Sequence, residues 1–146
     1  MSEGPLTASA IIRFSTELEA RSAGFYRELT ARYPQHEETF AGWAEECGKS
    51  STQVTRTYRE TITDALEAGF SFAGLSLAAY EVDLDLPAGI GLDQALGKAV
   101  ALEEQAIAFY QDVAERSDSL LATIPHAFRR AARTRQRRLE ELGTLG

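Results

Sequence analysis

Two glutamates of this chain lie on helical stripes that are otherwise apolar, and each precedes a tyrosine by seven residues. Residues 17–30 read ELEARSAGFYRELT and residues 101–114 read ALEEQAIAFYQDVA. Aligned, the two segments match at four positions: Leu18 with Leu102, Glu19 with Glu103, Phe25 with Phe109, and Tyr26 with Tyr110. Seven residues are two helical turns, so each carboxylate lies in line with its own tyrosine. A carboxylate in an apolar stripe costs free energy unless it is neutralised or hydrogen-bonded. The spacing therefore predicts a partner for each glutamate, either a metal ion or a cation of the chain itself.

Cations are concentrated in residues 128–142, FRRAARTRQRRLEEL, which contain six arginines. Phe128, Ala131, Arg135, Arg138 and Leu142 recur at intervals of three and four residues, which is the spacing of one helix face. Arg135 and Arg138 are therefore predicted to point inward. The other four arginines are predicted to face water or neighbouring acids.

The apolar spacing predicts four helices, over residues 7–32, 35–68, 92–116 and 118–142. Thr7 or Ser9 can cap the first helix, Gly69 ends the second, and Asp118 or Ser119 begins the fourth. Pro125 lies early in the fourth helix, where it marks a break or a restart.

The segment between the second and third helices, residues 69–91, is long for a connection inside one domain. From Tyr80 to Leu86 it alternates apolar and acidic residues, as an extended segment with one buried side does. About 20 extended residues reach roughly 65 Å, whereas a 30-residue helix is about 45 Å long. The connector can therefore run the length of a bundle. The predicted fold is an all-α, single-domain four-helix bundle over residues 1–146, in which two helical hairpins are joined by one crossover connector.

The paired glutamates and the hairpin connectivity resemble the rubrerythrin and ferritin-like family, and the resemblance covers nearly the whole chain. Members of that family have an inward glutamate before a phenylalanine–tyrosine pair on the first and third helices. They have Glu-x-x-His on the second and fourth helices, and these six residues hold two iron ions. The segment FAGWAEECGKSS, from Phe40, follows the family's second-helix pattern. The resemblance places the six ligand positions at Glu19, Cys47, Ser50, Glu103, Arg135 and Arg138.

The ligand positions depart from the family's pattern, since only Glu19 and Glu103 keep a ligand. A one-residue shift of the second helix pairs Glu46 with Lys49 and supplies no histidine. The chain has two histidines, at 36 and 126, and His126 is about 13 Å along the helix axis from residue 135. Iron requires carboxylate and imidazole donors, and two inward arginines would repel it. The expected protein has no catalytic residue, metal or cofactor.

Our main hypothesis is that Arg135 and Arg138 replace the metal by pairing with Glu19 and Glu103 across the core, because arginine stays charged and grips a carboxylate with two hydrogen bonds. The chain would then be a non-catalytic structural, binding or regulatory module. One alternative has all six arginines facing solvent or surface acids such as Glu45 and Glu46.

A second alternative is a residual oxidoreductase or iron-handling protein, with iron or zinc held by Glu19 and Glu103 together with Glu46 or Cys47. The activity of the family favours this alternative, and the small number of remaining metal ligands opposes it.

The bulk composition bears on compartment and partners. The net charge is −7, and residues 128–142 contribute +4, so the remainder sums to −11 and opposes nucleic-acid binding. Cys47 is the only cysteine, which favours a reducing compartment. The first residues do not resemble a secretory signal, and no stretch approaches the roughly 18–20 apolar residues of a membrane span. We therefore expect a cytoplasmic protein. A homodimer is expected, formed through helix faces or through the apolar part of the connector, and any other protein partner is unknown.

Overall fold

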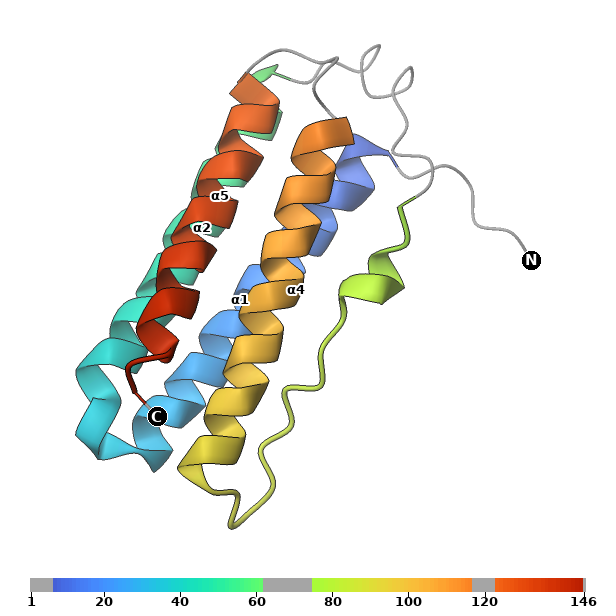
Figure 1. The fold of residues 1–146 in the computed structure, drawn as a ribbon. Coiled ribbons are helices and arrows are strands. Elements are labelled where there is room, and N and C mark those ends of the chain that lie inside the picture. The colour runs from blue at the N-terminus through green and yellow to red at the C-terminus, as the bar shows by residue number, and fades with distance from the viewer. Residues whose placement is uncertain (1–6, 62–74, 117–122, 146) are drawn as a thin grey trace.

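The computed structural model describes residues 7–61, 75–116 and 123–145, which form an all-α bundle (Figure 1). Its helices are α1 (Ala8–Arg32), α2 (Glu37–Thr61), α4 (Leu92–Arg116) and α5 (Thr123–Leu142), and within the described ranges there is no β-strand. The bounds predicted for the first and third helices are confirmed. The predicted end of the second helix at residue 68 and the predicted start of the fourth at residue 118 or 119 lie outside the described residues.

The helix ends follow from local chemistry. Thr7 caps α1, and its Oγ1 accepts a hydrogen bond from the backbone N–H of Ala10 at 3.2 Å. A short 3-10 turn, Pro34–His36, then reverses the chain into α2. Pro125 lies in the first turn of α5, where a backbone N–H would have no helical partner, so its missing donor costs nothing there.

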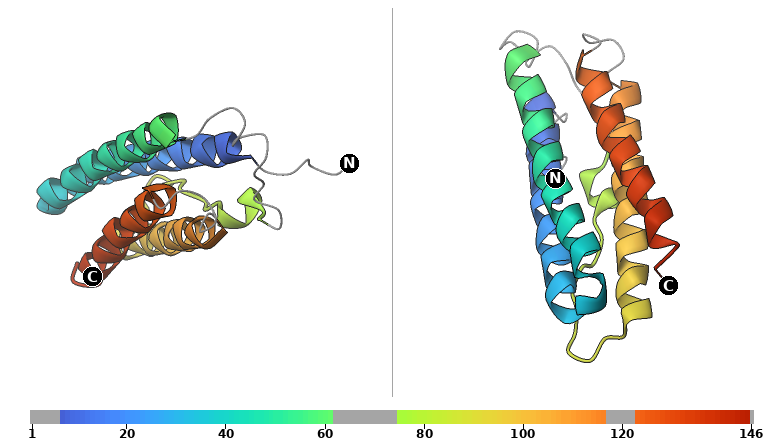
Figure 2. Two further views of the ribbon diagram at one scale, coloured as in Figure 1. Left: turned by 90° about the horizontal axis from the view of Figure 1, so that it is seen from above. Right: turned by 90° about the vertical axis from the view of Figure 1, so that its left-hand side faces the viewer.

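The helices pack as two antiparallel hairpins, α1 with α2 and α4 with α5. The hairpins approach each other more closely along α2 and α5 than along α1 and α4 (Figure 2). Buried aromatic rings fill much of the space between the helices: Phe25, Tyr26, Phe40, Trp43, Phe109, Tyr110 and Phe128. None of the helices in the described part of the chain is both long enough and apolar enough to cross a bilayer.

The part of the connector that the structure describes, residues 75–91, runs the length of the bundle beside α1 and α4 (Figure 1). It begins with a short 3-10 helix, η2 (Leu77–Tyr80), and continues in extended form. Tyr80 and Leu86 are buried, and the acidic residues between them are exposed, as the alternation predicts. Arginines of α1 bind the connector through its backbone carbonyl groups: Arg21 Nη2 donates to the carbonyl oxygen of Val82 at 3.1 Å, and Arg32 Nη2 to that of Leu86 at 2.7 Å.

Candidate functional site: a buried arginine–carboxylate cluster

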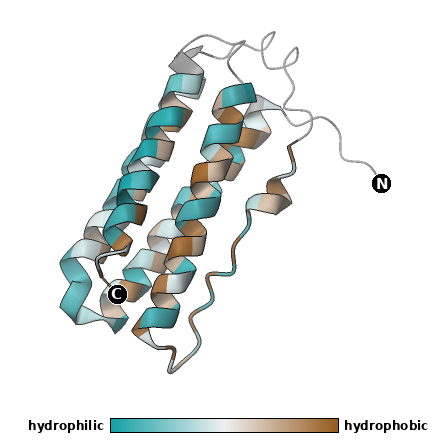
Figure 3. Cartoon of the chain, viewed as in Figure 1, coloured by the Kyte–Doolittle hydropathy of each residue, from teal (hydrophilic) through white to brown (hydrophobic). Residues whose placement is uncertain are grey.

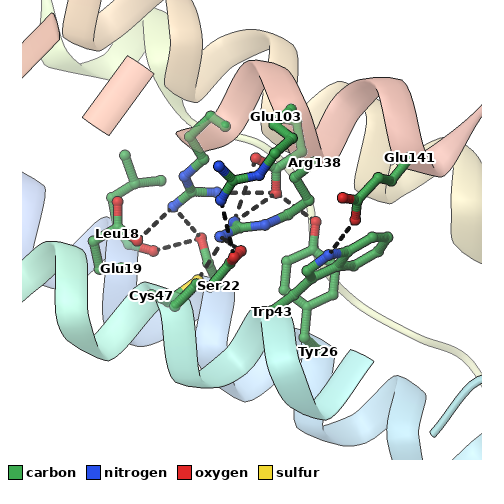
Figure 4. Close-up of polar contacts among 12 residues, drawn as sticks. Leu18, Glu19, Ser22, Tyr26, Trp43, Cys47, Glu103, Arg138 and Glu141 are labelled. Atoms are coloured by element: carbon green, nitrogen blue, oxygen red, sulfur yellow. Dashed lines mark hydrogen bonds and ion pairs between the residues drawn. The ribbon is translucent and has the colours of Figure 1, made fainter. Parts of the chain in front are cut away.

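Four charged side chains meet in the middle of the bundle, out of reach of water (Figure 4). Glu19 comes from α1, Glu103 from α4, and Arg135 and Arg138 from α5, and none of these residues is more than 1% exposed. Isolated charges would be very costly at such positions, so each must be neutralised by its neighbours.

Arg135 bridges the two hairpins. Its Nη2 lies 2.9 Å from Glu19 Oε1 and its Nη1 lies 3.0 Å from Glu103 Oε2. Nη2 also donates a hydrogen bond to Ser22 Oγ at 3.0 Å. One guanidinium therefore neutralises carboxylates of α1 and α4 together, which the planar, multi-donor geometry of arginine allows.

Arg138 extends the cluster to the second helix. Its Nη1 lies 3.2 Å from Glu103 Oε2, and its Nη2 lies 3.0 Å from Glu46 Oε1 on α2. The guanidinium carbon lies 5.5 Å from the centre of the Tyr26 ring, within the range of a cation–π contact. Through the two arginines, all four helices are joined at one level of the bundle.

The two tyrosines of the repeated segments brace these carboxylates crosswise. Tyr26 of the first hairpin donates a hydrogen bond to Glu103 of the second. Tyr110 of the second hairpin donates to Glu19 Oε2 of the first, at 2.6 Å. Because the single hydroxyl proton of Tyr110 is committed to Glu19, Ser15 Oγ, 2.9 Å away, donates to the oxygen of Tyr110.

Burial and charge fix the protonation states of the donors. Burial is the main cause that raises the pKa of Tyr26 and of Tyr110 well above its ordinary value, so both remain protonated donors at neutral pH. For Arg135, burial lowers the pKa, but the combined attraction of Glu103 and Glu19 outweighs this, and the pKa lies above its ordinary value. The guanidinium therefore stays charged inside the core.

Small side chains of α2 leave room for the two arginines. Cys47 is fully buried, with its Sγ 3.5 Å from Arg138 Nη1, and Ser50 is 9% exposed one turn further along. Burial raises the pKa of the Cys47 thiol to about 11, despite the two nearby guanidiniums. A neutral, buried thiol is a poor nucleophile at physiological pH, so Cys47 acts as a small core residue.

The structure brings together Glu19, Glu103, Arg135 and Arg138, and it places Cys47 against them. Sequence reasoning missed the role of Glu46, which appeared only as a surface acid or a possible metal ligand. It also missed Ser22 as an acceptor for Arg135. Their positions in the sequence could have indicated both roles. Glu46 is adjacent to the inward Cys47, and Ser22 lies between Glu19 and Tyr26 on the same helix.

One exposed arginine reaches the edge of the cluster, and the histidines lie away from it. Arg137 pairs with Glu46 at 3.2 Å, as expected of an arginine that meets a neighbouring acid. His36 lies in the 3-10 turn, with its ring 5.9 Å from that of Phe40. His126 is exposed in the first turn of α5, at the opposite end of the bundle from His36.

These residues do not fit the diiron centre that the family resemblance implies. The guanidinium of Arg135 lies between Glu19 and Glu103, where cations would have to bind, and that of Arg138 lies against Glu103, so both carboxylates already have charged partners. Among the described residues, no three histidine, cysteine, aspartate or glutamate side chains are grouped so that they could hold a metal ion.

Comparisons of the chain with protein-family models, with curated proteins and with solved structures find no match. The fold and the site define a four-helix bundle with a buried arginine–glutamate cluster. Its function has to be argued from that geometry.

Replacement of either cross-bracing tyrosine by phenylalanine is expected to lower the free energy of unfolding by about 1.5–3 kcal/mol, because a buried carboxylate loses a hydrogen bond. Tyr80→Phe is the matched control, since Tyr80 also donates to a carboxylate, Asp112, at 2.6 Å, but that carboxylate is only partly buried and water can reach it. Its cost is expected to stay below about 1 kcal/mol. Urea unfolding measures the free energy of unfolding of the Tyr26→Phe, Tyr110→Phe and Tyr80→Phe variants. Equal costs for Tyr26→Phe and Tyr80→Phe would contradict the bracing role.

Proposed function

We propose that this protein is a metal-independent, non-catalytic member of the ferritin-like class, related to rubrerythrins, that works as a structural, binding or regulatory module. The proposal rests on one observation: Arg135 lies between Glu19 and Glu103, within 3.0 Å of each. Those are the carboxylates that the resemblance assigns to a diiron site. The two hairpins and the long connector along α1 and α4 support the ferritin-like connectivity.

The electrostatics of the core support a replacement of metal by arginine. Two buried carboxylates without a cation would repel each other and take up a proton or destabilise the bundle. Arg135 and Arg138 supply two fixed positive charges against the two negative charges of Glu19 and Glu103. The core therefore keeps its charge balance without a metal ion.

The state of the remaining groups argues against chemistry at this site. The thiol of Cys47 is neutral, both tyrosines are committed as hydrogen-bond donors, and both carboxylates are engaged by guanidiniums. A general base or nucleophile needs an accessible reactive atom, and none of these groups offers one. We therefore assign the activity of the protein to its surface.

Metal analysis of the purified protein tests this proposal. Protein expressed in iron-rich or zinc-supplemented medium is expected to carry far less than one metal ion per chain, and chelator treatment is expected to leave the melting temperature unchanged. About one tightly held ion per chain, together with a melting temperature that falls on chelation, would instead establish the residual metal protein.

A further inference from the structure

The connector is bound to the bundle in the way that a separate extended peptide would be. Between Val82 and Leu86 it forms no backbone–backbone hydrogen bond within the described part of the chain. Side chains of α1 bind its carbonyl groups instead, and Arg21 donates to that of Val82 at 3.1 Å. Arg32 donates to the carbonyl oxygens of Leu86 at 2.7 Å and of Pro87 at 3.0 Å. Because every residue carries the same carbonyl group, these bonds fix the path of a bound segment without selecting its side chains.

Alternate side chains of the connector make the contact with the core. Tyr80 and Leu86 are buried, and Val82 and Leu84 between them are partly buried and pack against the core. The ring of Tyr80 meets that of Phe109 edge-on, with the two centroids 5.4 Å apart. Figure 3 shows the alternation of hydrophobic and hydrophilic residues along the connector. The bundle therefore accepts an extended segment that has an apolar side chain at every second position.

Charge is complementary along the connector. Glu81, Asp83 and Asp85 are exposed and point away from the core, between the inward apolar residues. The helix side chains that bind the connector here are cations: the two arginines of α1, and Lys98 of α4. Lys98 Nζ lies 3.4 Å from the backbone oxygen of Asp83 and 3.4 Å from its carboxylate. This surface therefore favours a segment whose outward residues are acidic.

We propose that this surface, which we name the connector site, binds an extended segment of a partner protein in which apolar and acidic residues alternate. The connector is then the resident occupant that the partner segment displaces. The connector site consists of the side chains that contact the connector: Arg21, Arg32 and Tyr33 of the first hairpin, and Lys98, Phe109 and Asp112 of α4.

The contacts of the connector are of a kind that open without unfolding the bundle. In the described connector only Tyr80 and Leu86 are buried, and the arginine and lysine donors are exposed or half-buried. A segment with few buried contacts opens at a lower free energy than the core helices. As part of the same chain, the connector has an effective concentration on the order of millimolar. It therefore occupies the site until a segment that binds more tightly replaces it.

An acidic and apolar segment fits the connector site better than a basic or a wholly polar one. A basic segment would meet the cations of both helices, and a polar one would leave the ring of Phe109 without an apolar neighbour from the connector. The inference goes beyond the proposed function, because it names a site and a partner chemistry. It does not rest on the absence of metal from the core, so either can fail while the other stands.

Fluorescence anisotropy with a labelled peptide of the connector sequence, residues 75–91, tests the site. Tyr80→Ser with Leu86→Ser, the loosened variant, removes both buried anchors of the connector and leaves the helices unchanged. It is expected to bind the peptide at least about tenfold more tightly than the wild-type chain, in which the intact connector competes. Circular dichroism checks the fold. If the loosened variant does not fold, Val82→Ser with Leu84→Ser, at partly buried positions, takes its place in the same measurement.

Two pairs of arginines on α1 locate the bound peptide. Added to the loosened variant, Arg21→Gln with Arg32→Gln removes the donors to the peptide carbonyls and is expected to weaken binding about tenfold. Arg13→Gln with Arg27→Gln is the matched control, because these exposed arginines make no hydrogen bond to the described connector. It is expected to change binding by less than about twofold.

A second peptide tests the partner chemistry. Lysine in place of Glu81, Asp83 and Asp85 reverses the outward charges of the peptide and keeps its apolar residues. This peptide is expected to bind the loosened variant at least about tenfold more weakly than the connector peptide does.

Three results would overturn the proposal. A folded loosened variant that binds the peptide no better than the wild-type chain has no exchangeable site. Equal binding of the lysine-substituted peptide would reduce the site to an unselective apolar surface. A loosened variant that binds the wild-type chain, and not the peptide, would assign the site to the connector of a second copy instead.

Discussion

Replacement of both buried arginines, Arg135→Ala with Arg138→Ala, is expected to lower the free energy of unfolding by at least about 3–5 kcal/mol, because it leaves Glu19 and Glu103 as buried charges without partners. In a chain of this size, 1 kcal/mol shifts the melting temperature by about 2–4 °C, so the expected loss is roughly 6–20 °C. Thermal unfolding followed by circular dichroism measures it.

Two exposed arginines of the same helix provide the control. Arg130→Ala with Arg133→Ala removes the same number of charges from α5 without uncovering a buried carboxylate, and is expected to change the free energy of unfolding by less than about 1 kcal/mol. If the buried and the exposed double variants melted alike, the cluster would not hold the core together.

The second large effect is the creation of a metal site. A variant with Cys47→Glu, Ser50→His, Arg135→Glu and Arg138→His restores the ligand types that the family resemblance assigns to these positions. It is expected to bind about two iron or zinc ions per chain, because four carboxylates and two imidazoles would then converge in the core. Without metal the like charges should destabilise it, so its melting temperature should rise steeply when metal is added. Elemental analysis and thermal unfolding with and without metal measure both effects.

A fifth substitution tests whether the designed ligands act as one site. Adding Glu103→Gln, which keeps the shape of the side chain and removes its charge, is expected to lower the metal content and most of the metal-induced stabilisation. A four-fold variant that folds but binds no metal would show that the register of the resemblance is wrong. The relation to diiron proteins would then lose its main support.

Periodicity predicted much of this molecule because burial imposes a repeat on a helix. The bounds of α1 and α4 follow from their apolar stripes and from signals such as the Thr7 cap. The intervals of three and four residues predicted that Arg135 and Arg138 point inward. The alternation from Tyr80 to Leu86 predicted which side of the connector is buried. Each of these patterns lies within one element, where spacing in the sequence fixes direction in space.

The partners across elements could not be predicted in this way. Spacing placed Glu19 in line with Tyr26, but the hydrogen bond of Tyr26 goes to Glu103 on the other hairpin. Likewise, Glu46 pairs with Arg138 because of how α2 packs against α5. Such pairings depend on the distance and rotation between helices, and the spacing of residues along one helix contains neither.

The bridging position of Arg135 has a consequence for how the bundle comes apart. If one hairpin separated from the other, the guanidinium would lose Glu19, and each tyrosine would lose the carboxylate that it braces. A half-opened molecule would therefore expose broken ion pairs as well as apolar surface, and both raise its free energy. We therefore expect the two hairpins to unfold together as one cooperative unit, which coincident transitions by different probes would confirm.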